Sequence, residues 1–296
     1  MGRKLLFVIN PNSGKGRIKN KLLEVVDIFI KDGWNVSVYI TQRALDACKI
    51  VEESGEGFDR VVVSGGDGTL NEVIWGVMKI PEKKRPHIGY IPAGTVNDFA
   101  SNMHISKNII KAAQKAIGDE KFRCDVGNFG DKNFVYIAAF GAFTDVSYET
   151  PQQNKNILGQ LAYFLEGIKK IHNLPFCKMR ITCNGDVLED EFILGMVSNS
   201  NRIAGFKTGK ALKAELNDGL FEVVLIKRPK TLMELSDLGS RLLTQDLNCD
   251  MIKIFRTSSI RFEAEEEVRW TLDGEFGGSV LNTEISVNKE AVTLII

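Results

Sequence analysis

The sequence has few of the residues that build metal clusters, disulfide frameworks or catalytic triads. Among 296 residues there are three histidines and five cysteines, and the cysteines are odd in number and scattered, without a CxxC pair. This argues against zinc and against disulfides, and predicts mostly buried free thiols in a cytoplasmic protein. His87, His104 and His172 lie far apart and have no triad-like Ser or Cys partners, so we expect structural or surface roles for them.

An excess of charge and long apolar runs are also absent. Lys+Arg and Asp+Glu both number 38, so the net charge is zero and no nucleic-acid partner is predicted. No apolar run approaches the roughly 18 residues that a transmembrane segment requires. The run Leu5–Ile9 ends without a cleavage site and predicts a first strand, not a signal peptide. The densest basic run, Lys83-Lys84-Arg85, predicts a solvated loop.

Strand and helix patterns alternate from the N-terminus to about residue 125. The strand runs are apolar with little polar alternation, which is typical of strands buried on both faces. We therefore predict an α/β domain with a mostly parallel sheet and helices on both faces, whose ligands bind at the carboxyl ends of the strands. The expected strands are Leu5–Ile9, Val36–Ile40, Val61–Val63 and Ile88–Ile91, and the expected helices are Ile18–Ile30, Ala44–Glu53, Leu70–Met78 and Ile109–Ile117.

After Asp125 the pattern changes to strands joined by tight turns. Asn128–Phe134 and the Asn184-Gly185 pair predict hairpins. We predict two domains, residues 1–126 and 127–296, of which the second is β-rich and mostly antiparallel. The last strand, Val292–Ile296, can return to either domain. Further expected strands are Phe192–Val197, Leu220–Ile226, Ser259–Phe262, Val268–Leu272 and Glu284–Val287, with helices at Ile157–Ile171 and Leu232–Leu243.

The strongest local signal is the glycine-rich loop Ser64–Glu72, which follows a predicted strand and opens a helix. Its glycines allow close approach to a ligand, and a helix start presents free N–H groups to phosphate oxygens. Asp67 would lie there, where a carboxylate can hold Mg²⁺ or a bridging water. The plain alternative is a glycine-rich turn in which Asp67 caps the helix.

Two further loops of similar composition, Asn10–Gly16 and Pro92–Ala100, follow two other strands. Because the carboxyl ends of parallel strands meet at one edge of a sheet, the three loops would face one crevice. This convergence favours phosphate binding over turn geometry alone. None of the loops is a Walker A loop, since the pattern GxxxxGK[ST] is absent.

These loops carry a resemblance to a known family, the diacylglycerol kinase catalytic-domain family in its soluble bacterial branch, with sphingosine and ceramide kinases as relatives. The resemblance implies a phosphofructokinase-like nucleotide domain and a β-rich lipid-substrate domain. Tyr148–Pro151 and Leu158–Phe164 resemble the Gram-positive diacylglycerol kinases in particular. The shared motifs are Asn10-Pro11-x-Ser13-Gly14, Gly65–Glu72, Pro92-x-Gly94-Thr95-x-Asn97-Asp98-Phe99-Ala100, Asn217-Asp218-Gly219 and Asp273-Gly274-Glu275.

The resemblance also implies roles for single residues. Glu275 would be the general base, and Asp67 would be the second catalytic residue. Magnesium would be held by Asp218 and by the backbone carbonyls of Glu215 and Leu220, and it would be joined through water to Asp67, Asp98 and Asp125. ATP would contact Asn10, Pro11, Asn12, Ser13, Gly14, Thr41, Gly66, Asp67, Gly68, Thr69, Leu70, Asn71, Glu72 and Thr95.

By residue type alone, Asp218-Gly219 and Asp273-Gly274-Glu275 are first of all hairpin turns with solvated acids. Phosphoryl transfer does need a carboxylate that orients or deprotonates the attacking hydroxyl. The resemblance therefore favours Glu275 as that base, with geometry as the test.

Three functions are open at this point. The first is an ATP- and Mg²⁺-dependent kinase of diacylglycerol or a related lipid, peripheral at the inner membrane surface and without a spanning helix. The second is a soluble-metabolite kinase such as an NAD kinase, which shares the GGDGT motif of residues 65–69. The third is a non-catalytic nucleotide or lipid sensor on the same scaffold. The oligomeric state, a homodimer included, stays open.

Overall fold

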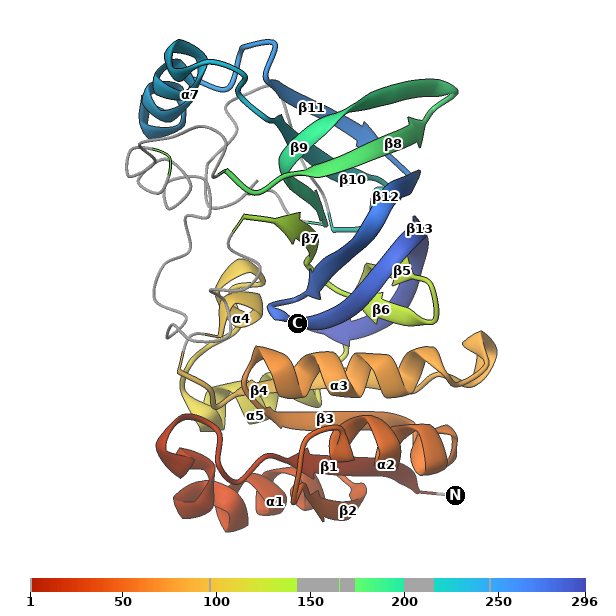
Figure 1. Cartoon of the computed structure of the whole chain (residues 1–296). Helices are drawn as coiled ribbons and strands as arrows, with labels where there is room; N and C mark the ends of the chain where they lie inside the picture. Colours follow the sequence, from red (N-terminus) through yellow and green to blue (C-terminus); the bar gives the residue numbers. More distant parts are fainter. Residues whose placement is uncertain (1, 96, 143–164, 166–173, 200–215, 245) are drawn as a thin grey trace. The chain divides into compact units, whose positions relative to one another are not determined.

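The computed structural model describes residues 2–95, 97–142, 165, 174–199, 216–244 and 246–296 (Figure 1). The chain forms two compact units, Met1–Cys124 with Glu290–Ile296, and Asp125–Lys289. The sequence pattern placed this boundary at residue 126 and left the last strand open; in the structure that strand belongs to the first unit. The expected helix Ile157–Ile171, apart from Leu165, and the motifs Tyr148–Pro151 and Leu158–Phe164 lie outside the described residues.

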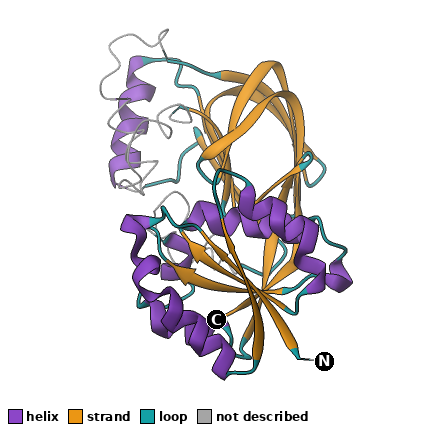
Figure 2. Ribbon diagram, turned by 90° about the horizontal axis from the view of Figure 1, so that it is seen from below, coloured by secondary structure: helices purple, strands orange, loops and turns teal. Residues whose placement is uncertain are grey.

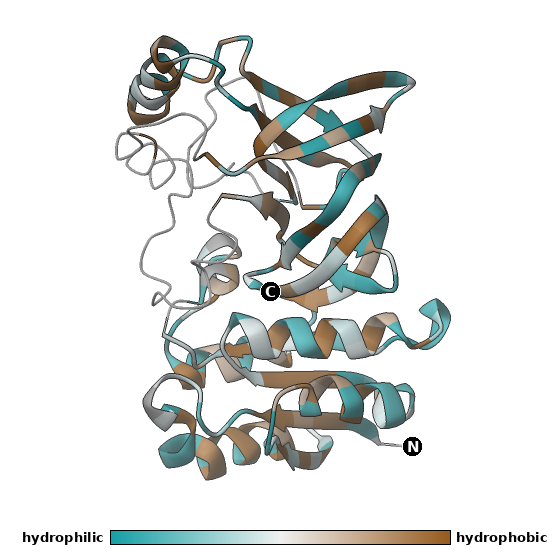
Figure 3. Cartoon of the chain, viewed as in Figure 1, coloured by the Kyte–Doolittle hydropathy of each residue, from teal (hydrophilic) through white to brown (hydrophobic). Residues whose placement is uncertain are grey.

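The first unit contains a sheet in the order β13-β4-β3-β1-β2, and all its neighbouring strands pair in parallel. Two of its three interior strands, β1 and β3, are buried along most of their length, and both are mostly brown in Figure 3. Continuous apolar runs suit such central positions, because both faces of the strand are covered. The strands are β1 Arg3–Ile9, β2 Trp34–Ile40, β3 Arg60–Gly65, β4 His87–Pro92 and the last residues of β13 Glu275–Ile295.

Helices cover both sides of these strands (Figure 2), with α2 against α3 and α1 against α5. The single helix predicted over Ile18–Ile30 is wrong in its first part, where a 3₁₀ helix precedes α1. The α-helices are α1 Leu22–Lys31, α2 Asp46–Ser54, α3 Asp67–Met78, α4 Asp98–Asn102 and α5 Ile109–Ala116, and the 3₁₀ helices are η1 Gly14–Lys21, η2 Gly55–Gly57 and η3 Glu82–Lys84.

The prediction of a solvated basic loop holds for Lys83 and Lys84, which are exposed, but not for Arg85, which is half-buried. Its guanidinium donates to the carbonyl oxygens of Ile80 at 3.0 Å, Met78 at 3.1 Å and Ala291 at 2.8 Å. Burial lowers the pKa of Arg85. Three carbonyl acceptors offset that cost, and Arg85 thereby fixes the last strand against the end of α3.

The second unit confirms the prediction of a β-rich, mostly antiparallel part. Its strands follow the order β11-β10-β9-β7-β12-β13, and the pairs between them are antiparallel. The two runs predicted at Ser259–Phe262 and Val268–Leu272 form one strand with a register shift between Glu263 and Val268. The elements are β5 Lys121–Phe129, β6 Lys132–Phe134, β7 Ile137–Gly141, β8 Cys177–Cys183, β9 Asp186–Ser198, β10 Phe221–Lys227, α7 Leu232–Thr244, β11 Ile252–Thr257, β12 Ser259–Leu272 and β13.

Both predicted hairpins are present. Gly130, with φ of 59°, turns β5 into β6, and Asn184 and Gly185, with φ of 53° and 89°, join β8 to β9. Two central residues with positive φ match the right-handed twist of the flanking strands, and Asn-Gly adopts that conformation at low cost.

An aromatic cluster forms the core of the second unit. The ring of Trp270 lies 4.8 Å from that of Phe140 and 5.0 Å from that of Phe262, between ring centroids. The cysteines are free, as predicted, but only Cys48 and Cys124 are buried and the other three are half-buried. Within the described residues, no helix is both long enough and apolar enough to cross a bilayer.

Candidate functional site

The three glycine-rich loops meet at one edge of the sheet in the first unit, since β1, β3 and β4 are parallel and adjacent. They are in direct backbone contact. A Cβ added to Gly14 would lie 2.1 Å from the carbonyl oxygen of Ala93, and one added to Gly94 would lie 2.6 Å from the Cα of Gly66. Side chains essentially never reach such distances, so glycine is required at these positions for the loops to pack together.

Hydrogen bonds join the loops further. The amide of Asn10 donates to the hydroxyl of Thr69 at 3.0 Å, and the backbone N–H of Ala93 donates to the carbonyl of Gly65 at 2.8 Å. Thr41, at the end of β2, is buried and donates its backbone N–H to the carbonyl of Ile9 at 2.9 Å. The structure therefore brings the predicted ATP-contacting segments of all four strand ends to one edge.

Asp67 is the first residue of α3, and it joins the Ser64–Glu72 loop to the Pro92–Ala100 loop. Its Oδ1 accepts the backbone N–H of Phe99 at 3.1 Å. Phe99 is the second residue of α4, which begins at Asp98. Gly66 occupies the N-cap position of α3 and makes no side-chain cap. The carboxylate of Asp67 thus binds the start of a different helix, α4.

Asn97 fixes the shape of the Pro92–Ala100 loop, although the sequence pattern indicated no separate role for it. It is buried, has a left-handed φ of 57°, and exchanges two hydrogen bonds with Gly94, from N–H to Oδ1 at 2.9 Å and from Nδ2 to the carbonyl at 2.7 Å. Asn tolerates the left-handed region and bonds its neighbouring backbone better than most residues do. An Asn three residues after a loop glycine was the available signal.

Glu72 points its carboxylate to the start of α2. Its Oε2 accepts the backbone N–H of Ala47 at 3.2 Å. Burial raises the pKa of Glu72, while hydrogen bonds from the backbone of Leu45, Ala47 and Cys48 act in the opposite direction. A carboxylate at a helix start satisfies N–H groups that the helix leaves free.

In the second unit, Asp125 holds the turn that precedes β10. Its backbone N–H donates to the carbonyl of Leu216 at 2.8 Å, and its buried Oδ2 accepts the backbone N–H of Gly219 at 2.7 Å. Within the turn, Asp218 Oδ1 accepts the N–H of Leu220 at 2.9 Å. The predicted metal residues Asp218, Leu220 and Asp125 therefore lie together, while Glu215 is outside the described residues.

Arg256 on β11 bridges two carboxylates beside this turn. Its Nε donates to Glu222 Oε1 at 3.0 Å, and its Nη2 donates to Asp218 Oδ2. Glu222 is only 1% exposed, so it needs a cationic partner. Burial alone would lower the pKa of Arg256, but the hydrogen bond and charge of Asp218, with those of Glu222, raise it.

The oxygen donors of the 216–220 turn suit a magnesium site in which water supplies most of the ligands. The described residues contain no group of three or more His, Cys, Asp or Glu that could hold a metal. One carboxylate from Asp218 and one carbonyl from Leu220 nevertheless match Mg²⁺, which binds through one or two carboxylates and keeps several waters. The residues present therefore fit a water-rich magnesium site.

The Asp273-Gly274 turn between β12 and β13 orients Glu275. Asp273 and Gly274 have φ of 52° and 89°, and Leu272 pairs with Glu275 across the turn. The carboxylate of Asp273 accepts three backbone N–H groups, those of residues 135, 136 and 137, at 2.7–2.9 Å. Asp273 is thus not the solvated acid of the plain hairpin interpretation, whereas Glu275 is exposed.

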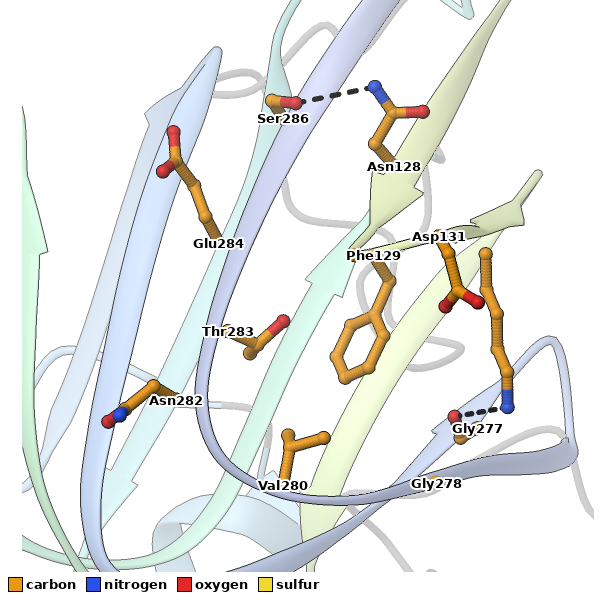
Figure 4. Close-up of a pocket in the computed structure, with 12 residues that line it drawn as sticks. Asn128, Phe129, Asp131, Gly277, Gly278, Val280, Asn282, Thr283, Glu284 and Ser286 are labelled. Atoms are coloured by element: carbon orange, nitrogen blue, oxygen red, sulfur yellow. Dashed lines mark hydrogen bonds between the residues drawn. The ribbon is translucent and has the colours of Figure 1, made fainter.

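The structure also contains a pocket that the sequence did not indicate (Figure 4). It has a volume of about 530 Å³ and lies in the second unit between the β5–β6 hairpin and β13. The Nζ of Lys132 donates to the carbonyl of Gly277 at 2.8 Å on its wall. Its lining, in the part of the chain that the structure describes, includes none of the residues predicted to bind ATP or metal.

Comparisons with known proteins agree with this architecture. Residues 4–129 match the family described as the diacylglycerol kinase catalytic domain, and residues 140–296 match the YegS C-terminal NAD kinase beta sandwich-like domain. A crystal structure of a diacylglycerol kinase from Bacillus anthracis str. Sterne has the same fold, with a TM-score of 0.72 at 24% identity, covering 99% of this chain and 97% of that one. These matches define a two-domain chain with a diacylglycerol kinase catalytic domain followed by a β-sandwich-like domain.

Curated relatives match along nearly the whole length. A diacylglycerol kinase of Staphylococcus carnosus is 34% identical over 283 residues, covering 95% of this chain and 91% of the relative. A diacylglycerol kinase of Bacillus subtilis is 32% identical over 278 residues, covering 93% and 91%. The chain belongs to the diacylglycerol kinase family and is a lipid kinase.

Proposed function

We propose that the protein transfers the γ-phosphoryl group of ATP to the free hydroxyl of diacylglycerol, giving phosphatidic acid and ADP. The observation that carries the proposal is the contact of three glycine-rich loops at one edge of the sheet, through Gly14, Gly66 and Gly94. Glycine loops and a helix start are suited to triphosphates, because backbone N–H groups can approach the phosphate oxygens.

In this proposal ATP lies on Asn10, Pro11, Asn12, Ser13 and Gly14, on Thr41, on the segment from Gly66 to Glu72, and on Thr95. Asp218 and the backbone carbonyls of Glu215 and Leu220 would hold magnesium, and Asp67, Asp98 and Asp125 would be the acids that reach it through water. When bound, the metal would neutralise phosphate charge in the transition state.

Glu275 is the proposed general base. The hydroxyl oxygen of the lipid attacks the γ-phosphorus, the bond to the β–γ bridging oxygen breaks, and the hydroxyl proton moves to the carboxylate of Glu275. Support comes from the Asp273 carboxylate, whose three backbone hydrogen bonds give the Glu275 backbone a fixed position. We further propose that the enzyme works in the cytoplasm, peripherally at the inner surface of the membrane that carries its substrate.

One assay tests the acceptor. The purified protein is incubated with γ-labelled ATP, MgCl₂, and either diacylglycerol in mixed micelles or NAD in solution. Label in phosphatidic acid is the expected result. The match of the second unit to an NAD kinase-like domain makes NAD the relevant competitor. Label in NADP, or ATP binding without transfer to either acceptor, would overturn the proposal.

Glu275→Gln tests the base. We expect turnover to fall by about 10²–10⁴-fold, the usual contribution of a positioned acid or base, with the KM for ATP little changed. Glu267→Gln is the matched control, because Glu267 is also an exposed glutamate of the β12–β13 hairpin and has no assigned role. Equal turnover of the two variants would remove Glu275 from the mechanism.

A further inference from the structure

Arg256 stands where a bound cation would neutralise the 216–220 turn. Its guanidinium reaches Asp218 with Nη2 and the buried Glu222 with Nε, at 3.0 Å for the latter. Glu222 and Arg256 are cross-strand partners on β10 and β11, so the position of the arginine is set by the sheet. Asp218, by contrast, belongs to a turn and reaches Arg256 from there.

Both carboxylate oxygens of Asp218 are already engaged. Oδ1 accepts the backbone N–H of Leu220 at 2.9 Å, and Oδ2 accepts the guanidinium of Arg256. A carboxylate oxygen has a second lone pair, so a metal can still bind there. It would then share its ligand with a fixed positive charge, and this repulsion weakens the binding of a divalent cation.

The ion pair between Arg256 and Asp218 differs from a surface ion pair because its groups and the acids around them are largely buried. Asp125 is fully buried, Glu222 is 1% exposed, and the side chains of Arg256 and Asp218 are 27% and 21% exposed. Three carboxylates and one guanidinium thus lie at or beside a single turn in a poorly solvated place. Charges in such places are screened less by water and salt than exposed ones are.

We infer that Arg256 is a resident cation that competes with Mg²⁺ for Asp218 and so sets the affinity of the metal site. Without metal, the arginine keeps Asp218 and Glu222 paired and the turn folded. With metal, the Asp218 carboxylate shifts its interaction toward Mg²⁺, while Arg256 remains on Glu222. The affinity for Mg²⁺ is therefore lower than the acidic surroundings alone would give. This inference rests on the magnesium site of the proposed function.

The test measures Mg²⁺ binding without nucleotide or lipid, by isothermal titration calorimetry at constant ionic strength. Removal of Arg256 alone would take the guanidinium partner at 3.0 Å away from the buried carboxylate of Glu222, which is destabilising in itself. The informative comparison is therefore between Glu222→Gln and the double variant Glu222→Gln/Arg256→Gln. Arg261→Gln is the control for a general charge effect, because Arg261 pairs with Glu284 on the exposed surface of the same unit.

We expect the double variant to bind Mg²⁺ at least about tenfold more tightly than Glu222→Gln, the effect of losing one charge-assisted hydrogen bond. Arg261→Gln should bind like the unmodified protein, and Asp218→Asn should lose the site. Equal affinity of the double and single variants, with binding still lost in Asp218→Asn, would overturn the role of Arg256 and leave the metal site standing. Unchanged binding in Asp218→Asn would overturn both.

Discussion

Gly14 and Ala93 bring the backbones of the Asn10–Gly16 and Pro92–Ala100 loops into direct contact, and a Cβ on Gly14 would lie 2.1 Å from the Ala93 carbonyl oxygen. Gly14→Ala is therefore expected to lower stability by about 3 kcal/mol, because a clash adds to the roughly 1–2 kcal/mol penalty of a left-handed φ. Gly16→Ala is the matched control. Gly16 has a φ of 65°, but its added Cβ would meet nothing closer than 3.4 Å. Urea unfolding should show a clearly smaller loss for Gly16→Ala; equal losses would contradict the packing argument.

We expect that even the residue closest in shape to Asn97 cannot replace it without a loss of stability. In Asn97→Asp the side chain can no longer donate to the carbonyl of Gly94, which is left without that bond in a buried place. We expect a loss of about 2–3 kcal/mol in the free energy of unfolding and weaker ATP binding. Tyr90→Phe removes a hydroxyl that lies 3.3 Å from both the Asn97 Oδ1 and the Gly65 carbonyl oxygen, and this loss of long hydrogen bonds should cost less. A smaller loss in Asn97→Asp than in Tyr90→Phe would refute the role of the amide.

Glu72 predicts a pH dependence of stability. Burial raises its pKa above the usual 4.5, so the folded state favours the protonated form more than the unfolded state does. The stability this contributes is complete below pH 4.5 and is lost as the pH rises through the raised pKa. Glu72→Gln stays neutral and does not suffer that loss. Its free energy of unfolding relative to the unmodified protein should therefore increase with pH across this window, and a flat or falling difference would speak against it.

Arg85 predicts a contrast between neighbouring basic residues. Arg85→Lys cannot keep three carbonyl acceptors, and we expect a loss of about 2–3 kcal/mol. Lys84→Ala removes an exposed ion pair with Glu56 and should change stability by less than about 1 kcal/mol. Thermal unfolding of both variants decides the matter. Equal melting temperatures would show that the last strand does not depend on Arg85.

We expect Asp273 to affect catalysis only by positioning Glu275. Asp273→Asn keeps the shape of the side chain but places an N–H₂ group against backbone donors, and should cost about 2–4 kcal/mol. Turnover should fall while the KM for ATP stays close to its original value. Asp131→Asn, in the exposed β5–β6 turn, is the control. If Asp131→Asn lowers turnover as much as Asp273→Asn does, the three backbone hydrogen bonds are not what matters.

The elements themselves were largely predictable from the sequence, because strand and helix periodicity and tight-turn residues act over a few residues. The hairpin at Asn184-Gly185 and the helix that ends at Met78 follow from such local signals. Where a prediction was wrong, the local pattern was ambiguous. The run from Ile18 reads as one helix, but its first residues belong to the 3₁₀ segment Gly14–Lys21, which is polar on average and contains two glycines with positive φ.

The candidate site was predictable as a set of loops and acids. Gly66, Asp67 and Thr69 stand in a motif whose chemistry is visible in the sequence, and parallel strands place such motifs at one edge. Their individual partners were not predictable. Asp67 binds the N–H of Phe99, and Glu72 binds that of Ala47, 25 positions away in the chain.

The apolar strands, the turns and the glycine loops follow from the amino-acid sequence alone, because they depend on each residue's own size, shape and backbone freedom. The binding of Arg85 to Ala291, and of Arg256 to Asp218 and Glu222, became visible only in the folded chain. A charged side chain looks alike in the sequence whether it ends in water or against a partner. The pairing of distant strands supplies that partner, and no local pattern records it.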